Sequence, residues 1–242
     1  MTICFLFDVD GTLTEARQPM EEDFASFFES WIANKNVYLV SGSDLPKIRE
    51  QIPSKILNKC KGVFSCMGNE LWQKGQNDNL CQVYRNKLGL PKEIKSWLNE
   101  KIKDSEFERK QPPHFEFRSG MVNFSVVGRG ASAALRRYYY EWDEGKIERK
   151  IIAEEFNELF REKYGLEALI GGQTSLDIQK VGKDKSQILD HLNFEKYIFL
   201  GDRCFEGGND YSISLKVDEA CQVTDYKHTK KLLESYEFFE AT

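Results

Sequence analysis

Two aspartates separated by one residue are the first sign of chemistry in this sequence. Asp8 and Asp10 follow an apolar run, residues 3–7, in the segment FDVDGTLT. Such a run is typical of a buried strand, whose carboxyl end opens into the crevice where α/β sheets bind ligands. One carboxylate there could attack phosphorus while the other accepts and donates a proton. The alternatives are a solvated turn or half of a calcium loop, but Leu13 and Thr14 interrupt a calcium loop's ligand spacing.

A third carboxylate, Asp202, ends a later apolar run in the segment FLGDRCFEGGND. Because parallel strands end at the same edge of a sheet, we expect this side chain to lie near the first two aspartates. Three carboxylates around one crevice repel each other and a phosphate, unless a divalent cation lies among them. Oxygen ligands at a phosphate site favour Mg²⁺. The three aspartates therefore predict a magnesium site.

A lysine and two serines could bind the phosphate itself. Lys185, in VGKDKSQ, could neutralise a phosphoryl group together with Asp8. A lone lysine is usually a solvated surface charge, and only its place in this series of motifs favours a role in the site. Ser41 and Ser43, in SGSD after an apolar run at 37–40, could donate hydroxyl and backbone N–H groups to the same phosphate.

The elements that position these residues alternate between strands and helices in the first and last parts of the chain. This alternation predicts an α/β fold with a Rossmann-like core, a parallel sheet covered by helices on both faces. The predicted strands are 2–7, 37–40, 62–66 and 196–202, and the predicted helices are 21–34 and one from about Leu45.

The pattern changes near residue 82 to that of an α+β module. A hairpin is expected at 114–118 and 122–126, helices at 92–103, 131–142 and 150–164, and short strands within 168–178. We therefore predict a discontinuous core, 1–81 and 183–242, with an inserted α+β cap domain at 82–182.

The composition argues against nucleic-acid and membrane partners and indicates a reducing compartment. The 34 Lys and Arg against 39 Asp and Glu give 34 − 39 = −5, so the 242-residue chain lacks the basic surface typical of nucleic-acid or membrane binding. No apolar run approaches the roughly 20 residues of a membrane span. The six cysteines contain no CxxC pair, which indicates reduced thiols. We expect a soluble, cytoplasmic protein.

Taken in order, these motifs resemble those of the haloacid-dehalogenase superfamily of phosphotransferases. Over nearly the whole chain, the blocks FDVDGTLTEARQ, VSGSD, HFEFRSGMVNFSVVGR, GGQTSLDI and GDRCFEGGND are similar to eukaryotic-type phosphomannomutases. The spacing from Asp202 to Asn209 and Asp210 is that of the mutases, because related sugar phosphatases typically have a shorter GDxxND. The resemblance implies an isomerase of GDP-mannose biosynthesis, which interconverts mannose 6-phosphate and mannose 1-phosphate through an aspartyl phosphate, with a hexose 1,6-bisphosphate as activator.

The resemblance also implies a role for each site residue. Asp8 would be the nucleophile and Asp10 the general acid and base, while Asp8, the backbone carbonyl of Asp10, and Asp202 would bind Mg²⁺. Lys185 and Ser43 would hold the transferring phosphoryl group. A distal phosphate needs guanidinium donors that make no attack of their own. The remaining substrate-binding positions implied are Arg17, Arg118, Arg129, Arg136, Ser175 and Asp177.

Several alternatives stay open at this point. A Mg²⁺-dependent sugar-phosphate phosphatase would use the same core, and a non-catalytic sugar-phosphate sensor would bind without turnover. The preference between mannose and glucose is undecided, and the resemblance implies a homodimer through the cap. One departure from the family's pattern is the stretch Cys66-Met67-Gly68-Asn69-Glu70 after the third strand, where Glu-Asn-Gly is frequent. Another is Lys216, at a position where the family has an aspartate associated with a further cation, so a second cation site is not predicted and stays undecided.

Overall fold

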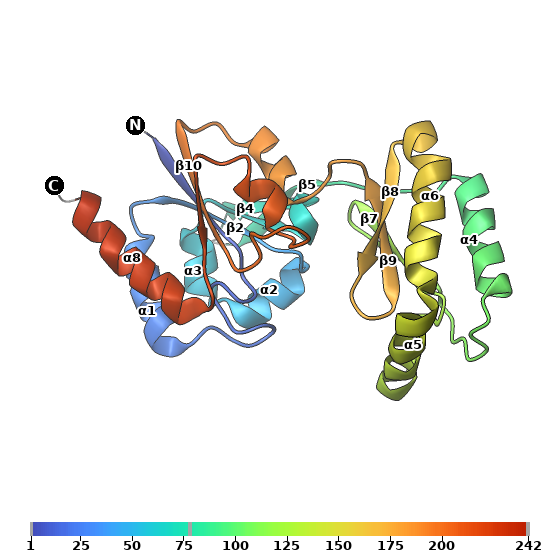
Figure 1. The fold of residues 1–242 in the computed structure, drawn as a ribbon. Helices are drawn as coiled ribbons and strands as arrows, with labels where there is room; N and C mark the ends of the chain where they lie inside the picture. The colour runs from blue at the N-terminus through green and yellow to red at the C-terminus, as the bar shows by residue number, and fades with distance from the viewer. Residues whose placement is uncertain (1, 77–78, 241–242) are drawn as a thin grey trace. The chain divides into compact units, whose positions relative to one another are not determined.

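The structure, a computed structural model, describes residues 2–76 and 79–240, and the chain divides into two compact units (Figure 1). One unit, the core, joins Met1–Arg85 to Lys183–Thr242, and the other, the cap, is Asn86–Gly182. The expected boundary after residue 81 falls inside a strand, β5 (Leu80–Arg85), which pairs with the strand before it in the sequence.

The core contains a seven-stranded sheet in the order β11-β10-β1-β2-β3-β4-β5. The first five strands of this order are parallel, and β4 and β5 pair in the antiparallel sense. β1 therefore lies between β10 and β2, so the segments that follow these three strands emerge at one edge. The bounds are β1 (Ile3–Phe7), β2 (Asn36–Val40), β3 (Gly62–Ser65), β4 (Glu70–Lys74), β5 (Leu80–Arg85), β10 (Lys196–Gly201) and β11 (Glu219–Gln222).

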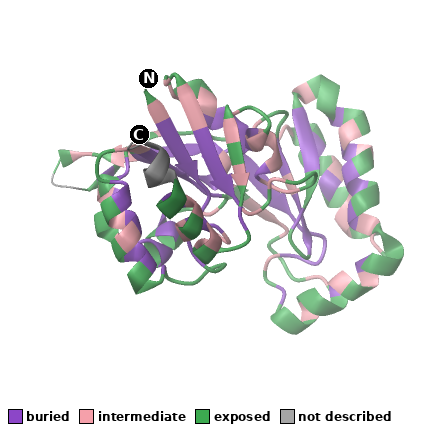
Figure 2. Ribbon diagram, turned by 60° about the vertical axis from the view of Figure 1, so that its left-hand side comes forward, coloured by how far each residue is buried: buried purple, intermediate pink, exposed green. Residues whose placement is uncertain are grey.

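Apolar side chains on both faces of the sheet explain why β1 is buried. Phe5 and Phe7 pack into one cluster with α1, α2, α3 and α8, whereas Cys4 and Leu6 pack into another with η3 and α7. Figure 2 shows these central strands buried and the outer sides of the helices exposed. The helices are α1 (Glu22–Trp31), α2 (Leu45–Gln51), α3 (Ser54–Lys59), η1 (Cys66–Gly68), η3 (Lys185–His191), α7 (Tyr211–Ser214) and α8 (Tyr226–Glu240). The predicted α/β fold with a parallel-sheet core is confirmed.

The cap is a four-stranded antiparallel sheet, in the order β6-β7-β9-β8, with helices on one face (Figure 1). Its buried cluster includes Val122, Phe124, Leu176 and Ile178 from the strands, together with side chains of the helices. The elements are α4 (Lys92–Asp104), β6 (Phe115–Arg118), β7 (Met121–Phe124), α5 (Ala133–Lys146), α6 (Glu148–Tyr164), β8 (Leu166–Gly171) and β9 (Ser175–Lys180). The expected hairpin is present as β6 and β7.

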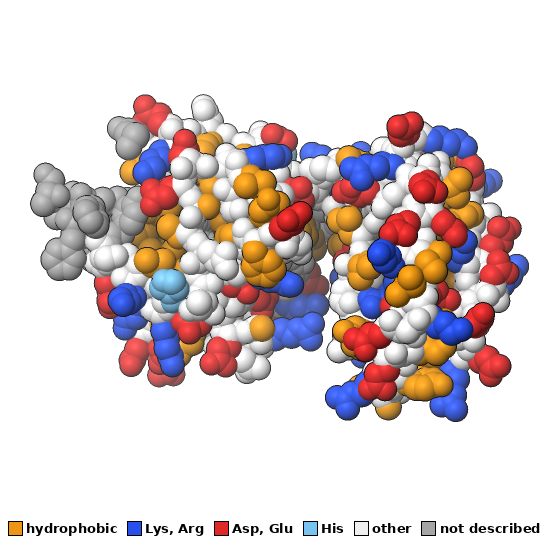
Figure 3. Space-filling model, viewed as in Figure 1, with side chains coloured by type: hydrophobic (Ala, Val, Ile, Leu, Met, Phe, Trp, Pro, Cys, Tyr) orange, Lys and Arg blue, Asp and Glu red, His pale blue; other side chains and the backbone are white. Residues whose placement is uncertain are grey.

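The surface carries both signs of charge. On the face drawn in Figure 3, acidic and basic side chains are interspersed over the cap helices. Among the described residues, no helix combines the length and apolar composition needed to cross a bilayer.

Candidate active site

The carboxyl ends of β1 and β10 bring the first motif and the Asp202 motif together. The backbone N–H of Asp8 donates to the Leu200 carbonyl at 2.9 Å, which ties the end of β1 to β10. Gly11 has φ +83°, and a Cβ there would lie 2.7 Å from Cγ of Asp202. Only glycine permits both this backbone conformation and this close approach, which explains the glycine of DVDGT.

Lys185 lies at the centre of the acidic cluster. Its side chain is fully buried, and its ammonium donates to Asp8 Oδ1 and, at 2.6 Å, to Asp210 Oδ1. The backbone N–H of Arg203 donates to the other Asp210 oxygen at 3.1 Å. Asp210 is therefore the fixed counter-ion of Lys185, and the lysine is held against the predicted nucleophile from the first turn of η3.

Burial dominates the electrostatics of this cluster. Burial, together with a smaller effect of Asp210, raises the pKa of Asp8 to about 7, against the lowering effect of Lys185. Burial and Asp210 also raise the pKa of Asp202. Burial alone would lower the pKa of Lys185, but Asp8 and Asp210 hold it above its usual value. The folded site thus concentrates more negative charge than its lysine compensates.

The donor set fits a divalent cation. One carboxylate oxygen each from Asp8, Asp202 and Asp210 lie within 4.8 Å of one another. When all three carboxylates are ionised, they and the one ammonium sum to −3 + 1 = −2, the charge that Mg²⁺ would neutralise, and hard oxygen ligands are those it prefers. Both Asp210 oxygens accept hydrogen bonds, of 2.6 and 3.1 Å, whereas Asp8 Oδ2 accepts only a longer one, at 3.4 Å from the Thr12 hydroxyl. Asp8 and Asp202 are therefore the carboxylates better placed to bind a metal.

Asp10, the second aspartate of the motif, is held by contacts that differ from those of Asp8. Its Oδ1 accepts from the backbone N–H of Arg17 at 2.8 Å and from Gln51 Nε2 at 2.9 Å. Gln51, which ends α2, is buried and also donates to Thr14 Oγ1 at 3.1 Å. The Arg17 side chain itself is exposed. Asp10 is therefore oriented through one oxygen only, within the described part of the chain.

The serine loop follows β2 and packs on the segment after β3. Ser41 Oγ accepts from the Ser43 backbone N–H at 3.0 Å, and Met67 donates its backbone N–H to the Ser41 carbonyl at 2.9 Å. Cys66 and Met67 both have positive φ, at 51° and 59°. A non-glycine residue in this region is strained by about 1–2 kcal/mol, so the altered Cys66-Met67-Gly68 stretch lies in a constrained turn beside the serine loop.

In the cap, two of the predicted arginines converge on one carboxylate. Glu116 accepts from Arg118 Nε at 2.9 Å and Nη2 at 3.1 Å, and from Arg129 Nε at 2.7 Å. The side chains of Arg118 and Arg129 are 36% and 27% exposed, so a ligand can reach them. The arginines hold the pKa of Glu116 below its usual value, Arg118 most strongly.

The other predicted cap residues have different surroundings. Asp177 accepts from Asn123 Nδ2 at 2.6 Å, and burial raises the pKa of Asp177 against the effect of Arg118 and Arg129. Ser175 is buried and donates to the Gly171 carbonyl at 2.9 Å. Arg136 is exposed on α5, and none of the ion pairs among residues 2–76 and 79–240 includes it. The structure therefore brings together Arg118, Arg129 and Asp177, and leaves Arg136 outside that group.

Sequence reasoning did not assign three residues that matter here: Asp210, Gln51 and Glu116. Asp210 belongs to the GGND end of the segment that contains Asp202, and this motif is the signal in the sequence that could have found it. Gln51 lacks any sequence motif. Glu116 lies two residues before Arg118, a spacing that puts both side chains on one face of a strand.

The chain is similar to known proteins over most of its length. A family model described as eukaryotic phosphomannomutase matches residues 24–236. The chain is 35% identical to phosphomannomutase 1 of Dictyostelium discoideum, with 96% of this chain and 95% of that protein covered. It is also 34% identical to the phosphomannomutase of Spinacia oleracea, covering 87% and 86%, and 33% identical to that of Saccharomyces cerevisiae, covering 86% and 83%.

Solved structures show the same fold at low sequence identity. The IMP-nucleotidase of Plasmodium falciparum matches with a TM-score of 0.65 and 17% identity, over 99% of this chain and 69% of that chain. A haloacid dehalogenase-like hydrolase from Bacteroides thetaiotaomicron matches with a TM-score of 0.58 and 14% identity, over 98% and 100%. At such identities the likeness concerns the fold alone.

Proposed function

The chain belongs to the eukaryotic phosphomannomutase family, and from this premise we propose that it interconverts mannose 6-phosphate and mannose 1-phosphate through a phosphorylated Asp8. The observation that carries the assignment of the site is the contact between Asp8 and the fully buried Lys185 at the edge of a parallel sheet. A solvent-exposed lysine would stabilise the negative charge of a phosphoryl group only weakly, whereas a buried ammonium can compensate that charge as the group is transferred.

The proposed chemistry begins with phosphorylation of the enzyme by hexose 1,6-bisphosphate. An Asp8 oxygen attacks phosphorus, the bond from phosphorus to the sugar oxygen breaks, and Asp10 supplies the proton that the sugar oxygen needs. Asp10 Oδ1 already accepts two hydrogen bonds, from Arg17 and Gln51, so Oδ2 is the oxygen that would carry the proton.

In the second half, a hydroxyl of a mannose monophosphate attacks the aspartyl phosphate. Asp10 accepts the hydroxyl proton, the bond from phosphorus to Asp8 breaks, and the bisphosphate forms again. The bisphosphate can then turn around in the site, so that its other phosphate faces Asp8. When that phosphate is transferred to Asp8, the sugar is released with its remaining phosphate on the other carbon.

Ser43 would donate to the transferring group, while the distal phosphate would bind Arg118 and Arg129, with Arg17 and Arg136 as further candidates. Ser175 and Asp177 would contact the sugar hydroxyls.

Magnesium is part of this proposal. Asp8, Asp202 and the backbone carbonyl of Asp10 would hold it, and when bound it would offset the excess negative charge of the site and polarise the phosphoryl oxygens. Asp210 would remain the partner of Lys185, which is why it is left out of this set.

We further propose a cytoplasmic homodimer joined through the cap. The six free cysteines are typical of a reducing compartment. The cap exposes several large apolar side chains on α5 and α6 and between them, among them Tyr138, Ile147, Ile151 and Leu159, as expected of an interface.

The distinction between mutase and phosphatase gives a direct test. With mannose 1-phosphate, Mg²⁺ and saturating hexose 1,6-bisphosphate, we expect isomerisation to exceed release of inorganic phosphate by at least about tenfold, a preference of about 1.4 kcal/mol. Both products are followed in one incubation, mannose 6-phosphate by a coupled assay and phosphate by colorimetry. Phosphate release that equals or exceeds isomerisation would favour the phosphatase. It would also suggest that the altered stretch Met67-Gly68-Asn69 and its neighbours admit water to the site.

The cap arginines give a second test. Arg118→Ala and Arg129→Ala should each raise KM for the sugar phosphate by roughly 10-fold or more, because each removes charge-assisted hydrogen bonds worth about 1.5–3 kcal/mol. Hydrolysis of acetyl phosphate, which lacks a distal phosphate, should change much less. Equal losses on both substrates would mean that the arginines serve folding instead of phosphate binding.

A further inference from the structure

Glu116 is placed to control the geometry of the two arginines. Its two oxygens accept three hydrogen bonds, a bidentate pair from Arg118 and a single bond from Arg129 Nε. Two guanidinium groups repel each other, and a carboxylate shared between them holds them at a fixed separation. The guanidinium of Arg129 has five N–H donors, and it contacts Glu116 through Nε. The two Nη atoms of Arg129 are therefore not the atoms that bind Glu116.

The strands extend this arrangement across the cap sheet. Glu116 is directly opposite Asn123 on β7, and Asn123 is directly opposite Asp177 on β9. Asn123 is buried and donates to Asp177 at 2.6 Å. Glu116, Asn123 and Asp177 therefore lie side by side on three neighbouring strands. This row connects the carboxylate that holds the arginines with the aspartate that is proposed to contact the sugar.

A contribution to folding stability does not explain why a carboxylate lies between these two arginines. The side chain of Glu116 is 40% exposed, and ion pairs with that exposure contribute little to the stability of the fold. A carboxylate beside a phosphate site also repels the phosphate, so its presence there opposes binding unless it improves the geometry of the donors.

We propose that Glu116 is a positioning residue for the distal-phosphate subsite, holding Arg118 and Arg129 through their Nε edges so that they meet the phosphate as a pair. This inference rests on the proposed phosphate-binding function of the two arginines. Its physical basis is that donors fixed before binding lose less conformational entropy when the ligand arrives.

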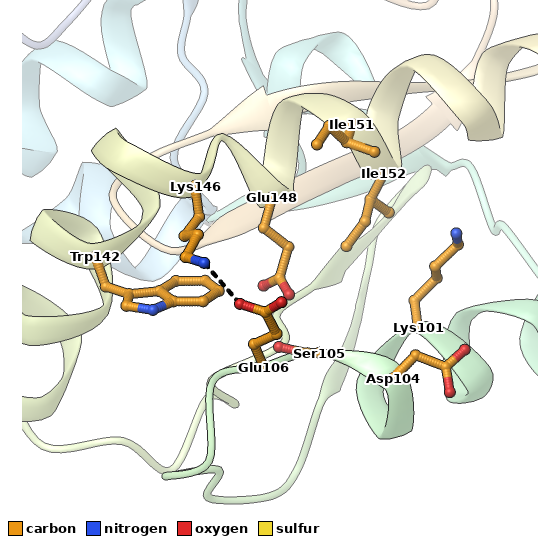
Figure 4. A pocket seen from close by; sticks show the side chains of 9 residues that line it. All are labelled: Lys101, Asp104, Ser105, Glu106, Trp142, Lys146, Glu148, Ile151 and Ile152. Carbon is orange, nitrogen blue, oxygen red and sulfur yellow. Dashed lines mark hydrogen bonds and ion pairs between the residues drawn. The ribbon is translucent and has the colours of Figure 1, made fainter.

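The test compares two substitutions at Glu116 with a matched control. Glu116→Gln removes the charge and one acceptor oxygen, and Glu116→Asp keeps the charge but is one methylene too short to reach both arginines. The control is Glu106→Gln, which removes one negative charge from the same unit. Glu106 pairs with Lys146 at 2.7 Å and lines a cavity of about 260 Å³ between α4, α5 and α6 that contains no predicted site residue (Figure 4).

We expect Glu116→Gln to raise KM for mannose 1-phosphate by about 10-fold, and Glu116→Asp to raise it by several-fold. In both variants kcat should change by less than about 3-fold. Acetyl phosphate hydrolysis, the melting temperature and the Glu106→Gln variant should stay close to wild type. In an Arg129→Ala background, Glu116→Gln should raise KM by a smaller factor than in the wild type, because only Arg118 is left for Glu116 to hold.

An unchanged or lower KM for Glu116→Gln, together with a raised KM for Arg129→Ala, would overturn the positioning role and leave the proposed function intact. It would mean that repulsion of the phosphate by Glu116 outweighs any gain in geometry. If Arg118→Ala and Arg129→Ala themselves leave KM unchanged, the proposed phosphate subsite is wrong, and the inference about Glu116 is refuted with it.

Discussion

Asp8→Asn is expected to lower turnover by at least about 10³-fold without loss of folded structure, because an amide cannot attack phosphorus. Asparagine is nearly isosteric, and its amide oxygen can still accept a hydrogen bond from Lys185. It also removes one negative charge from a buried cluster that has three carboxylates and one ammonium. The variant should therefore be as stable as the wild type, or more stable, in metal-free buffer.

The pH dependence of stability gives a second readout on Asp8. Burial raises its pKa in the folded state to about 7, above the value near 4 of an unfolded aspartate. A carboxyl group that binds its proton more tightly when folded favours folding at low pH, and this contribution is lost as the pH rises from about 4 to about 7. Asp8→Asn should abolish this part of the pH dependence, which chemical denaturation at several pH values would measure.

A matched control for Asp8→Asn is Glu29→Gln, which removes one negative charge from α1 on the surface of the same unit. Glu29 pairs with Lys55 and Lys59, and its loss should leave turnover unchanged. Turnover of Asp8→Asn within about 10-fold of the wild type would contradict the assignment of the nucleophile. A collapse of stability in Asp8→Asn would instead assign the aspartate a structural role.

Lys185→Met should abolish turnover and also destabilise the protein. Methionine is close in size to lysine, but it would leave Asp8 and Asp210 buried without a counter-charge. Breaking a buried ion pair from one side costs about 3–5 kcal/mol, which for a protein of this size lowers the melting temperature by on the order of 10 °C. Calorimetry and steady-state kinetics on the same sample would measure both losses.

A second substitution separates the two roles of Lys185. Adding Asp210→Asn to Lys185→Met removes one of the orphaned charges, so it should recover part of the lost stability. It should recover no activity, because the ammonium that faces Asp8 is still absent. A Lys185→Met variant that melts like the wild type would show that the lysine is not buried between two ionised carboxylates in the folded protein.

Local patterns in the sequence were sufficient to predict the elements that carry the site. The apolar run before Asp8 and the similar run before Asp202 predict buried strands, because a strand covered on both faces needs apolar residues at successive positions. The hairpin around Gly120 and the long amphipathic helices of the cap were predicted for the same kind of reason. By contrast, local patterns do not predict β4 and β5, because polar residues interrupt the apolar residues of both strands, and β5 is also the edge strand of the sheet.

The sequence by itself determined that acidic side chains follow buried strands and that two arginines lie near the cap hairpin. Only the tertiary structure decided which of these groups meet. Lys185 pairs with Asp8 across 177 positions of the chain, and Gln51 reaches Asp10 across 41. Such contacts depend on strand order and on the packing of α2 and η3 against the sheet, which periodicity does not encode. For the same reason the sharing of Glu116 between Arg118 and Arg129, which lie on different segments of the cap, became visible only in the folded chain.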